Sequence, residues 1–131
     1  MAITLNPAVR ALVDGRNYAT ISTLNPDGSP QSSVMWITRD GDDLIFSTLR
    51  DRRKERNLRR DPRASVSVWS SENPEVYAEI RGTVTITDDT GHAVVDALSH
   101  KYLGKPYPEE DPALVRVVLR LTPTKVTGHA A

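Results

Sequence analysis

Basic residues are concentrated in one short stretch of this sequence, residues 50–63. The stretch holds eight of the chain's 17 Lys and Arg residues but three of its 17 Asp and Glu residues, so its local charge is +5, whereas the chain as a whole has zero formal net charge. A protein that follows a nucleic acid usually presents a broad positive field instead. The local excess therefore indicates a binding site for one particular anion.

The groups at the start of this stretch have the chemistry of a phosphate site. Three cations, Arg52, Arg53 and Lys54, follow the hydroxyl groups of Ser47 and Thr48 by a few positions. In the first turn of a helix these cations would oppose the helix dipole unless an anion neutralised them, and the open N–H groups of that turn favour the same anion. Charge-assisted hydrogen bonds from such groups suit phosphate well.

The surrounding residues predict this helix. Residues 51–60 contain good helix formers without Gly or Pro, and Asp61-Pro62 ends the run. We expect Asp51 to be the N-cap. The residues alone also allow a solvated helix face, in which Glu55 pairs with Arg59 at i,i+4 and the other cations lie in water. A nucleic-acid site is disfavoured, because residues 50–63 include no aromatic side chain on which bases could stack.

Other kinds of site have little support in the sequence. The chain has no cysteine, and His92, His100 and His129 lack a zinc-binding spacing, so we expect no metal site. Neither a glycine-rich nucleotide-binding motif nor a Gly-x-Ser-x-Gly motif occurs. We therefore name no catalytic acid, base or nucleophile.

The remaining polar and aromatic candidates are interpreted as structural. Glu109-Glu110-Asp111 is expected to form an exposed loop, and Trp36, Tyr102 and Tyr107 are expected to be packing residues. No apolar run approaches the roughly 20 residues that cross a bilayer, and the amino terminus lacks the pattern of a secretory signal. We expect a cytoplasmic protein with a single domain, residues 1–131.

The elements that must position these groups are mainly strands. The strands are predicted from β-branched residues and from the alternation of polar and apolar residues between turns. Gly82, inside one of these strands, is expected to mark a bulge. In the strand that contains this glycine we expect Tyr77, Ile80, Val84 and Ile86 to be buried. Two further helices are expected, one starting at Asn6-Pro7 and one capped by Asp88-Asp89-Thr90 and ended by Gly104. The six predicted strands are residues 18–24, 30–38, 44–48, 64–69, 76–87 and 114–121, with residues 124–127 as an extension.

Six antiparallel strands with two or three short helices predict a closed or partly closed β-barrel, because closure removes exposed sheet edges. We expect the first three strands to form a meander. An open α+β sheet is the alternative. Apolar residues on both faces of some strands, as in Val117-Val118-Leu119, favour a homodimer that covers the second face.

The order of these segments resembles the pyridoxamine 5′-phosphate oxidase-like split barrels, and among them the small actinobacterial flavin/deazaflavin oxidoreductases that use coenzyme F420. The most specific motifs are Gly28-Ser29-Pro30-Gln31 and the stretch from Lys54 to Ala64, and the resemblance spans nearly the whole chain. It implies a mainly β, six-stranded antiparallel split barrel. It also implies a homodimer with two cofactor sites at the subunit interface.

The resemblance further implies which residues contact the cofactor. Residues of the second strand are expected to lie along the tricyclic ring. The hydroxyl groups at the end of the third strand and the cations at the start of the basic helix are expected to bind the phosphate, with Asn57 supporting that loop. Tyr77, with its neighbours Glu75 and Val76, is expected to approach the site from the partner subunit. The expected cofactor-binding residues are Gln31, Ser33, Val34, Met35, Ser47, Thr48, Arg52, Arg53, Lys54, Asn57 and Tyr77.

The number of cations in the basic stretch bears on which cofactor the protein binds. FMN ends in one phosphate, whereas F420 continues into a glutamate tail, and four further cations, Arg56, Arg59, Arg60 and Arg63, extend the positive charge beyond the first turn. The prediction is an F420-dependent oxidoreductase that transfers a hydride to a small conjugated acceptor such as a quinone, an enone or a tetrapyrrole. The alternatives are an FMN-dependent flavoprotein and a noncatalytic flavin or F420 carrier.

Overall fold

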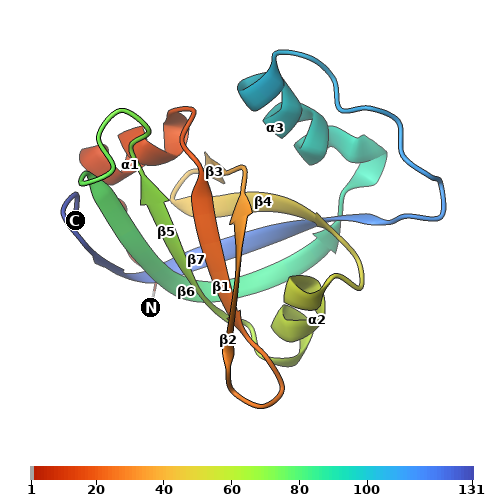
Figure 1. Ribbon diagram of the computed structural model, residues 1–131, viewed down its shortest axis with the longest axis horizontal. Helices are drawn as coiled ribbons and strands as arrows, with labels where there is room; N and C mark the ends of the chain where they lie inside the picture. Colours follow the sequence, from red (N-terminus) through yellow and green to blue (C-terminus); the bar gives the residue numbers. More distant parts are fainter. Residues whose placement is uncertain (1) are drawn as a thin grey trace.

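A seven-stranded antiparallel sheet forms most of the structure, a computed structural model that describes residues 2–131 (Figure 1). The strands follow one another in the sheet in the order β2-β1-β5-β6-β7-β4-β3, and every neighbouring pair is antiparallel. Their bounds are β1 Ala19–Leu24, β2 Pro30–Met35, β3 Thr38–Asp40, β4 Asp43–Leu49, β5 Arg63–Trp69, β6 Tyr77–Asp88 and β7 Arg116–Thr127.

The strand order explains why the sheet is a split barrel. The edge strands β2 and β3 lie at opposite ends of the order, yet only Trp36 and Ile37 join them. Since three consecutive Cα steps span at most about 11 Å, the sheet must curl until its two edges approach each other. The predicted split-barrel fold is therefore confirmed.

Two details of the predicted sheet are wrong. The strand expected over residues 30–38 is broken at Trp36, so there are seven strands instead of six. The first three predicted strands do not form a meander, because β2 pairs with β1 alone while β3, just beyond the break, pairs with β4 through Thr38 and Ile45. The break moves the chain from one edge of the barrel to the other.

The first helix, α1 (Pro7–Asp14), begins after Asn6 as expected. The Asn6 side chain caps it by accepting a hydrogen bond from the Val9 N–H at 2.8 Å. Val9, Leu12 and Val13 are buried in the same apolar cluster as the inward-facing residues of the strands.

The two other helices, α2 (Arg53–Arg60) and α3 (Ala93–Leu103), lie on either side of the ribbon of β4 in Figure 1. A short 3₁₀ turn, η1 (Thr90–His92), precedes α3. As the sequence suggests, the Asp89 carboxylate caps α3 by accepting from the N–H groups of its second and third residues at 2.9 and 3.0 Å. Gly104 ends α3 with φ of 73°, a conformation that favours glycine.

The bulge predicted at Gly82 is confirmed. The register of β6 against β7 shifts between Arg81 and Gly82, and a Cβ atom on Gly82 would lie 2.1 Å from the Thr122 carbonyl oxygen. Of the residues expected to be buried in β6, Ile80 and Val84 are buried, but Tyr77 is 40% exposed. Tyr77 begins the strand, and Gly128 packs against its ring but covers only part of it.

Candidate functional site

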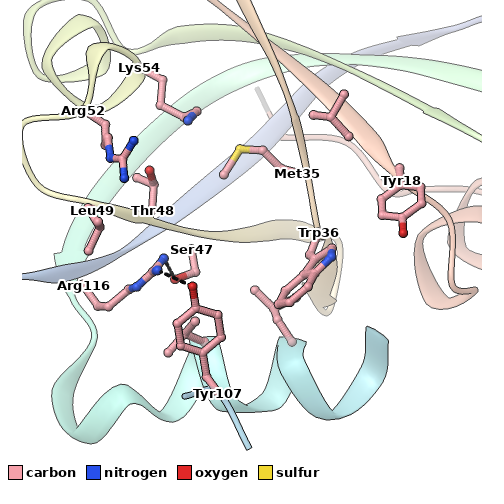
Figure 2. A pocket seen from close by; sticks show the side chains of 13 residues that line it. Tyr18, Met35, Trp36, Ser47, Thr48, Leu49, Arg52, Lys54, Tyr107 and Arg116 are labelled. Atoms are coloured by element: carbon pink, nitrogen blue, oxygen red, sulfur yellow. Dashed lines mark hydrogen bonds between the residues drawn. The ribbon is translucent and has the colours of Figure 1, made fainter. Parts of the chain in front are cut away.

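A pocket of about 370 Å³ opens where the barrel is split, between β2 and β4 (Figure 2). Its volume falls within the range of small-ligand sites. The N-terminus of α2 borders one end, and α3 with the segment that follows it borders the other. The lining residues are Tyr18, Val34, Met35, Trp36, Ser47, Thr48, Leu49, Arg52, Lys54, Val95, Leu98, Tyr107 and Arg116.

One end of the pocket is cationic. Arg52, Lys54 and Thr48 lie together there. Ser47 precedes Thr48 on β4, but its hydroxyl lies beside Arg116, which donates to it at 3.5 Å. Burial, followed by the neighbouring charge of Arg52, lowers the pKa of the half-buried Lys54. No ion pair between described residues includes Arg52 or Lys54. This end can therefore receive an anion without first breaking a salt bridge.

The start of α2 adds backbone donors to the cationic end. The N-cap is Arg52, so the prediction of Asp51 is wrong by one residue. Asp51 adopts φ of 73°, from which its N–H donates to the Glu55 carboxylate at 2.8 Å and its own carboxylate accepts from Arg59 at 2.8 Å. Within residues 2–131, the N–H groups of Arg53, Lys54 and Glu55 have no hydrogen-bond acceptor, which is typical of an anion-binding helix end.

The other end of the pocket is aromatic. Trp36 stacks on Tyr102 with ring centroids 5.4 Å apart and planes 6° apart, and the edge of Tyr107 meets Trp36 at 6.4 Å and 83°. Tyr102 also stacks on Tyr18. The prediction of a packing residue is confirmed for Tyr102, which is buried. Trp36 and Tyr107 pack against these rings but also face the pocket, which the sequence did not suggest.

Helix α3 holds the aromatic end in place. The Lys101 ammonium donates to the carbonyl oxygens of Val13 and Ile37 at 2.6 Å each. The hydroxyl of Tyr102 accepts from the Ile37 N–H at 3.2 Å and donates to the Asn17 carbonyl at 2.5 Å. Because Ile37 follows Trp36 directly, these bonds fix the break between β2 and β3.

Arg116 is a lining residue that the sequence analysis missed. It binds Glu110 through two hydrogen bonds of 2.7 and 2.9 Å, which hold the pKa of Glu110 below its usual range and raise the pKa of Arg116. The expectation that Glu110 belongs to an exposed loop is therefore wrong, since its side chain is only 14% exposed. The sequence does not predict this pair, because the two residues are brought together by an irregular segment whose path has no regular spacing.

Several predicted cofactor-binding residues do not line the pocket. Gln31 and Ser33 lie opposite Thr23 and Ile21 in the β1–β2 ladder, so their side chains share the inner face of the barrel with these two buried residues. The Gln31 side-chain oxygen accepts a hydrogen bond from Thr23 at 2.9 Å. The Ser33 hydroxyl oxygen is buried and has no hydrogen-bond partner in the described chain.

Three other predicted residues also lie elsewhere. Arg53 borders a separate shallow hollow with the β1–β2 turn, residues 25–27. Asn57 is fully buried and donates to the side chains of Thr23 and Asn25 at 3.0 Å each, so it ties α2 to that turn. Tyr77 is remote from the lining of the pocket in this single chain. The pocket thus unites six of the predicted residues, Val34, Met35, Ser47, Thr48, Arg52 and Lys54.

The positive charge beyond the first turn of α2 is smaller than the sequence suggests. Arg59 pairs with Glu55 at 2.9 Å, the i,i+4 pair that the alternative interpretation expected, and Arg63 pairs with Asp61 at 2.8 Å. Arg60 donates to the Leu24 carbonyl oxygen. Of the four cations expected to extend the anion site, Arg56 alone takes part in no ion pair or side-chain hydrogen bond within residues 2–131.

Residues 2–131 show neither a metal site of protein ligands nor a membrane-spanning helix. No group of three or more His, Cys, Asp or Glu side chains is placed to hold a metal ion. No helix has the length and apolar character needed to span a membrane.

Comparison with known proteins identifies relatives of this fold and sequence. The family model described as pyridoxamine 5′-phosphate oxidase matches residues 5–130. A solved structure named F420 reductase is 32% identical, with a TM-score of 0.83, and the match covers 94% of this chain and 98% of that one.

Two more distant structures show likeness in fold alone. A conserved hypothetical protein from Mycobacterium tuberculosis is 23% identical with a TM-score of 0.75, over 95% of this chain and 84% of that one. A pyridoxamine 5′-phosphate oxidase-related, FMN-binding protein from Nostoc punctiforme is 18% identical with a TM-score of 0.66, over 93% of this chain and 83% of that one.

Proposed function

The chain belongs to the pyridoxamine 5′-phosphate oxidase family, and from this premise we propose that it is an oxidoreductase that uses coenzyme F420 to transfer a hydride to a small conjugated acceptor. The observation that carries the proposal is the two-ended pocket. Its cationic end suits a phosphate, and its apolar and aromatic remainder suits a tricyclic ring. The similarity to an F420 reductase at 32% identity favours F420 over FMN.

The donor groups at the cationic end fit a phosphate. Lys54 is half-buried and carries its charge at a cost, as its lowered pKa indicates, and an anion would remove that cost. Arg52 and the Thr48 hydroxyl add donors at the same end. In this proposal the Ser47 hydroxyl also reaches the phosphate, together with Arg116, which lies beside it. In this proposal Arg53 contributes its open backbone N–H, and Asn57 acts by holding α2 in position.

The rest of the pocket orients the ring. When bound, F420 supplies the hydride from its tricyclic ring. Val34 and Met35 of the edge strand β2 form one apolar wall, and Leu49 and Leu98 lie across from them. These side chains hold the ring against the aromatic end and exclude water from it.

We also propose that the working form is a homodimer. Val34 is 64% exposed and Tyr77 is 40% exposed in the single chain, although both are large apolar side chains. A second copy that covers β2 would bury Val34 and bring its own Tyr77, with Glu75 and Val76, toward the ring. Gln31 and Ser33 then support the ring through the edge strand on which they lie.

FMN is the second candidate cofactor. The pairing of Arg59 and Arg63 with carboxylates leaves fewer cations for a glutamate tail, which weakens the charge argument for F420. A phosphate alone would satisfy Arg52 and Lys54.

A parallel fluorescence titration of the cofactor-free protein with F420 and with FMN at physiological salt decides between them. Tighter binding of F420 supports the proposal and directs the search for acceptors. Tighter binding of FMN moves the protein to the flavin-dependent branch, and binding of neither refutes the cofactor site.

A further inference from the structure

The hydroxyl group of Tyr107 has a proton that no described residue uses. Arg116 Nη2 donates to the Tyr107 hydroxyl oxygen at 3.0 Å. A guanidinium group can only donate, so Tyr107 is the acceptor in this bond and its own proton remains available. No acceptor for that proton occurs among residues 2–131. Tyr102 differs, because its hydroxyl donates to the Asn17 carbonyl.

The Tyr107 side chain is held from three directions. Its N–H donates to the Asp96 carboxylate at 3.0 Å, its ring packs edge-on against Trp36, and Arg116 lies over its ring at 4.8 Å from the centroid. Arg116 is itself fixed by two bonds to Glu110, and both of these side chains are mostly buried. Figure 2 shows the Tyr107 hydroxyl pointing up toward Ser47 and Arg116 at the floor of the pocket.

The other lining residues leave Tyr107 as the best-placed proton donor for a reaction at the aromatic end. No Asp, Glu or His is among the described residues that line the pocket, and Arg52, Lys54 and Thr48 lie at the cationic end. Arg116 lies beside Tyr107, but its pairing with Glu110 raises its pKa, so it keeps its protons. Ser47 accepts from Arg116 at 3.5 Å, and its hydroxyl is a weaker acid than the Tyr107 phenol. Tyr18 lies at the far side of the pocket from Tyr107 and is 49% exposed (Figure 2).

We propose that Tyr107 donates a proton to the carbonyl oxygen of the hydride acceptor, which makes the acceptor class α,β-unsaturated ketones and quinones. This inference rests on the proposed function. Such acceptors develop negative charge on oxygen as the hydride arrives, and a hydroxyl beside the Arg116 cation stabilises that charge. A conjugated acceptor without a carbonyl oxygen would make no use of this donor.

The reaction balances in atoms and electrons. The β-carbon of the acceptor gains a hydride, with its electron pair, from the reduced deazaflavin. The carbon–carbon π pair moves to form a new double bond to the carbonyl carbon, and the carbon–oxygen π pair moves to oxygen. That oxygen takes the Tyr107 proton, and the tyrosinate recovers a proton from solvent. The enol product of an unsaturated ketone then tautomerises to the saturated ketone. The enol product of a quinone tautomerises to the hydroquinone, as the β-carbon loses a proton and the second carbonyl oxygen gains one.

The first test measures hydrogen bonding and not turnover. 1,4-Naphthoquinone labelled with ¹³C at its carbonyl carbons is bound to the protein loaded with oxidised F420, and isotope-edited infrared difference spectra record the carbonyl stretch. We expect one carbonyl band to move to lower frequency in the wild type and in Tyr18→Phe, but not in Tyr107→Phe. An unshifted band in the wild type, or an equal shift in Tyr107→Phe, overturns the inference.

The second test measures rate with reduced F420 and naphthoquinone. We expect Tyr107→Phe to lower kcat by about 100-fold or more, the usual contribution of a positioned proton donor, while its dissociation constant for F420 is unchanged. An unchanged kcat contradicts the inference. If the wild type fails to bind F420, the proposed function is refuted, and the infrared test on the cofactor-free protein still decides whether Tyr107 binds a carbonyl.

Discussion

The basic stretch, residues 50–63, has a first half around Arg52 and Lys54 and a second half around Arg59 and Arg63. The cations of these two halves bind different partners in the folded protein. Arg52 and Lys54, at its start, line the pocket and take part in no ion pair within the described chain. Arg59 and Arg63, near its end, are bound to carboxylates at 2.9 and 2.8 Å. From the sequence alone, the paired and the unpaired cations cannot be told apart. The comparison teaches that an anion site is defined by the cations that the fold leaves unpaired on a concave wall.

The acidic residues of the stretch account for this difference. Asp51 and Glu55 both bind Arg59, and Asp61 binds Arg63, so all three carboxylates serve the second half. Asp51 adopts the left-handed conformation, and in it the Asp51 carboxylate accepts from Arg59 at 2.8 Å. None of the three carboxylates of the stretch therefore occupies Arg52 or Lys54, and both remain free for a ligand within the described chain.

The largest effect on binding is expected from the first half. Lys54→Ala and Arg52→Ala should each weaken binding of the preferred cofactor by about 1.5 to 3 kcal/mol, the usual scale for a hydrogen bond to a charged group. Fluorescence titration measures this loss, and urea unfolding should show that both variants remain as stable as the wild type. Unchanged affinity in both variants would refute the phosphate site.

A comparable effect, on stability instead of binding, is expected from the buried face of α2. Asn57→Ala removes the donors to Thr23 and Asn25 and should lower the free energy of unfolding by about 1 to 3 kcal/mol, because polar groups are left unsatisfied. Urea unfolding followed by circular dichroism measures it. Arg56→Ala, on the exposed face of the same helix, is the matched control and should be neutral. Equal stability of the two variants would show that Asn57 does not anchor α2.

The cationic end of the pocket was predictable because it is local in sequence. Ser47, Thr48, Arg52 and Lys54 lie within one strand end and one helix start, so residue type and spacing were enough. The caps at Asn6 and Gly104 and the bulge at Gly82 were predictable for the same reason.

The aromatic end could not be predicted in this way. Trp36, Tyr107 and Arg116 come from three segments that meet only in the folded chain. Neither Gly nor Pro marks the break at Trp36, so the strand was expected to continue through it. The break is fixed instead by hydrogen bonds of Ile37 with Lys101 and Tyr102 of α3, which lie far from Trp36 in the sequence. Gln31 and Ser33 fail as lining residues because the strand pairing, which the sequence does not specify, turns their side chains inward.

A smaller effect is expected from pH, and it separates Lys54 from the arginines. Burial and the Arg52 charge lower the Lys54 pKa from its ordinary 10.5, and the protonated form binds phosphate. Cofactor affinity should therefore stay level from pH 7 upward and fall as the pH passes through that lowered pKa. Lys54→Arg, whose guanidinium stays protonated, should remain level to a higher pH and thus also controls for ionisation of the ligand. Identical pH profiles would show that the Lys54 charge is not used.

The smallest effect is expected from the second half of the stretch. Arg63→Ala should change the affinity for either cofactor by less than about threefold, because the Arg63 charge is already used by Asp61 and is screened by solvent. Hydrogen bonds from the Arg63 side chain and N–H lower the pKa of Asp61 to about 2, so Asp61 is ionised and available to Arg63 at neutral pH. The informative comparison is between ligands. If Arg63→Ala weakens F420 binding severalfold but leaves FMN binding unchanged, Arg63 must exchange Asp61 for a carboxylate of the glutamate tail. The division of the basic stretch into a binding half and a self-neutralised half would then hold for FMN alone, and the charge argument for F420 would be restored.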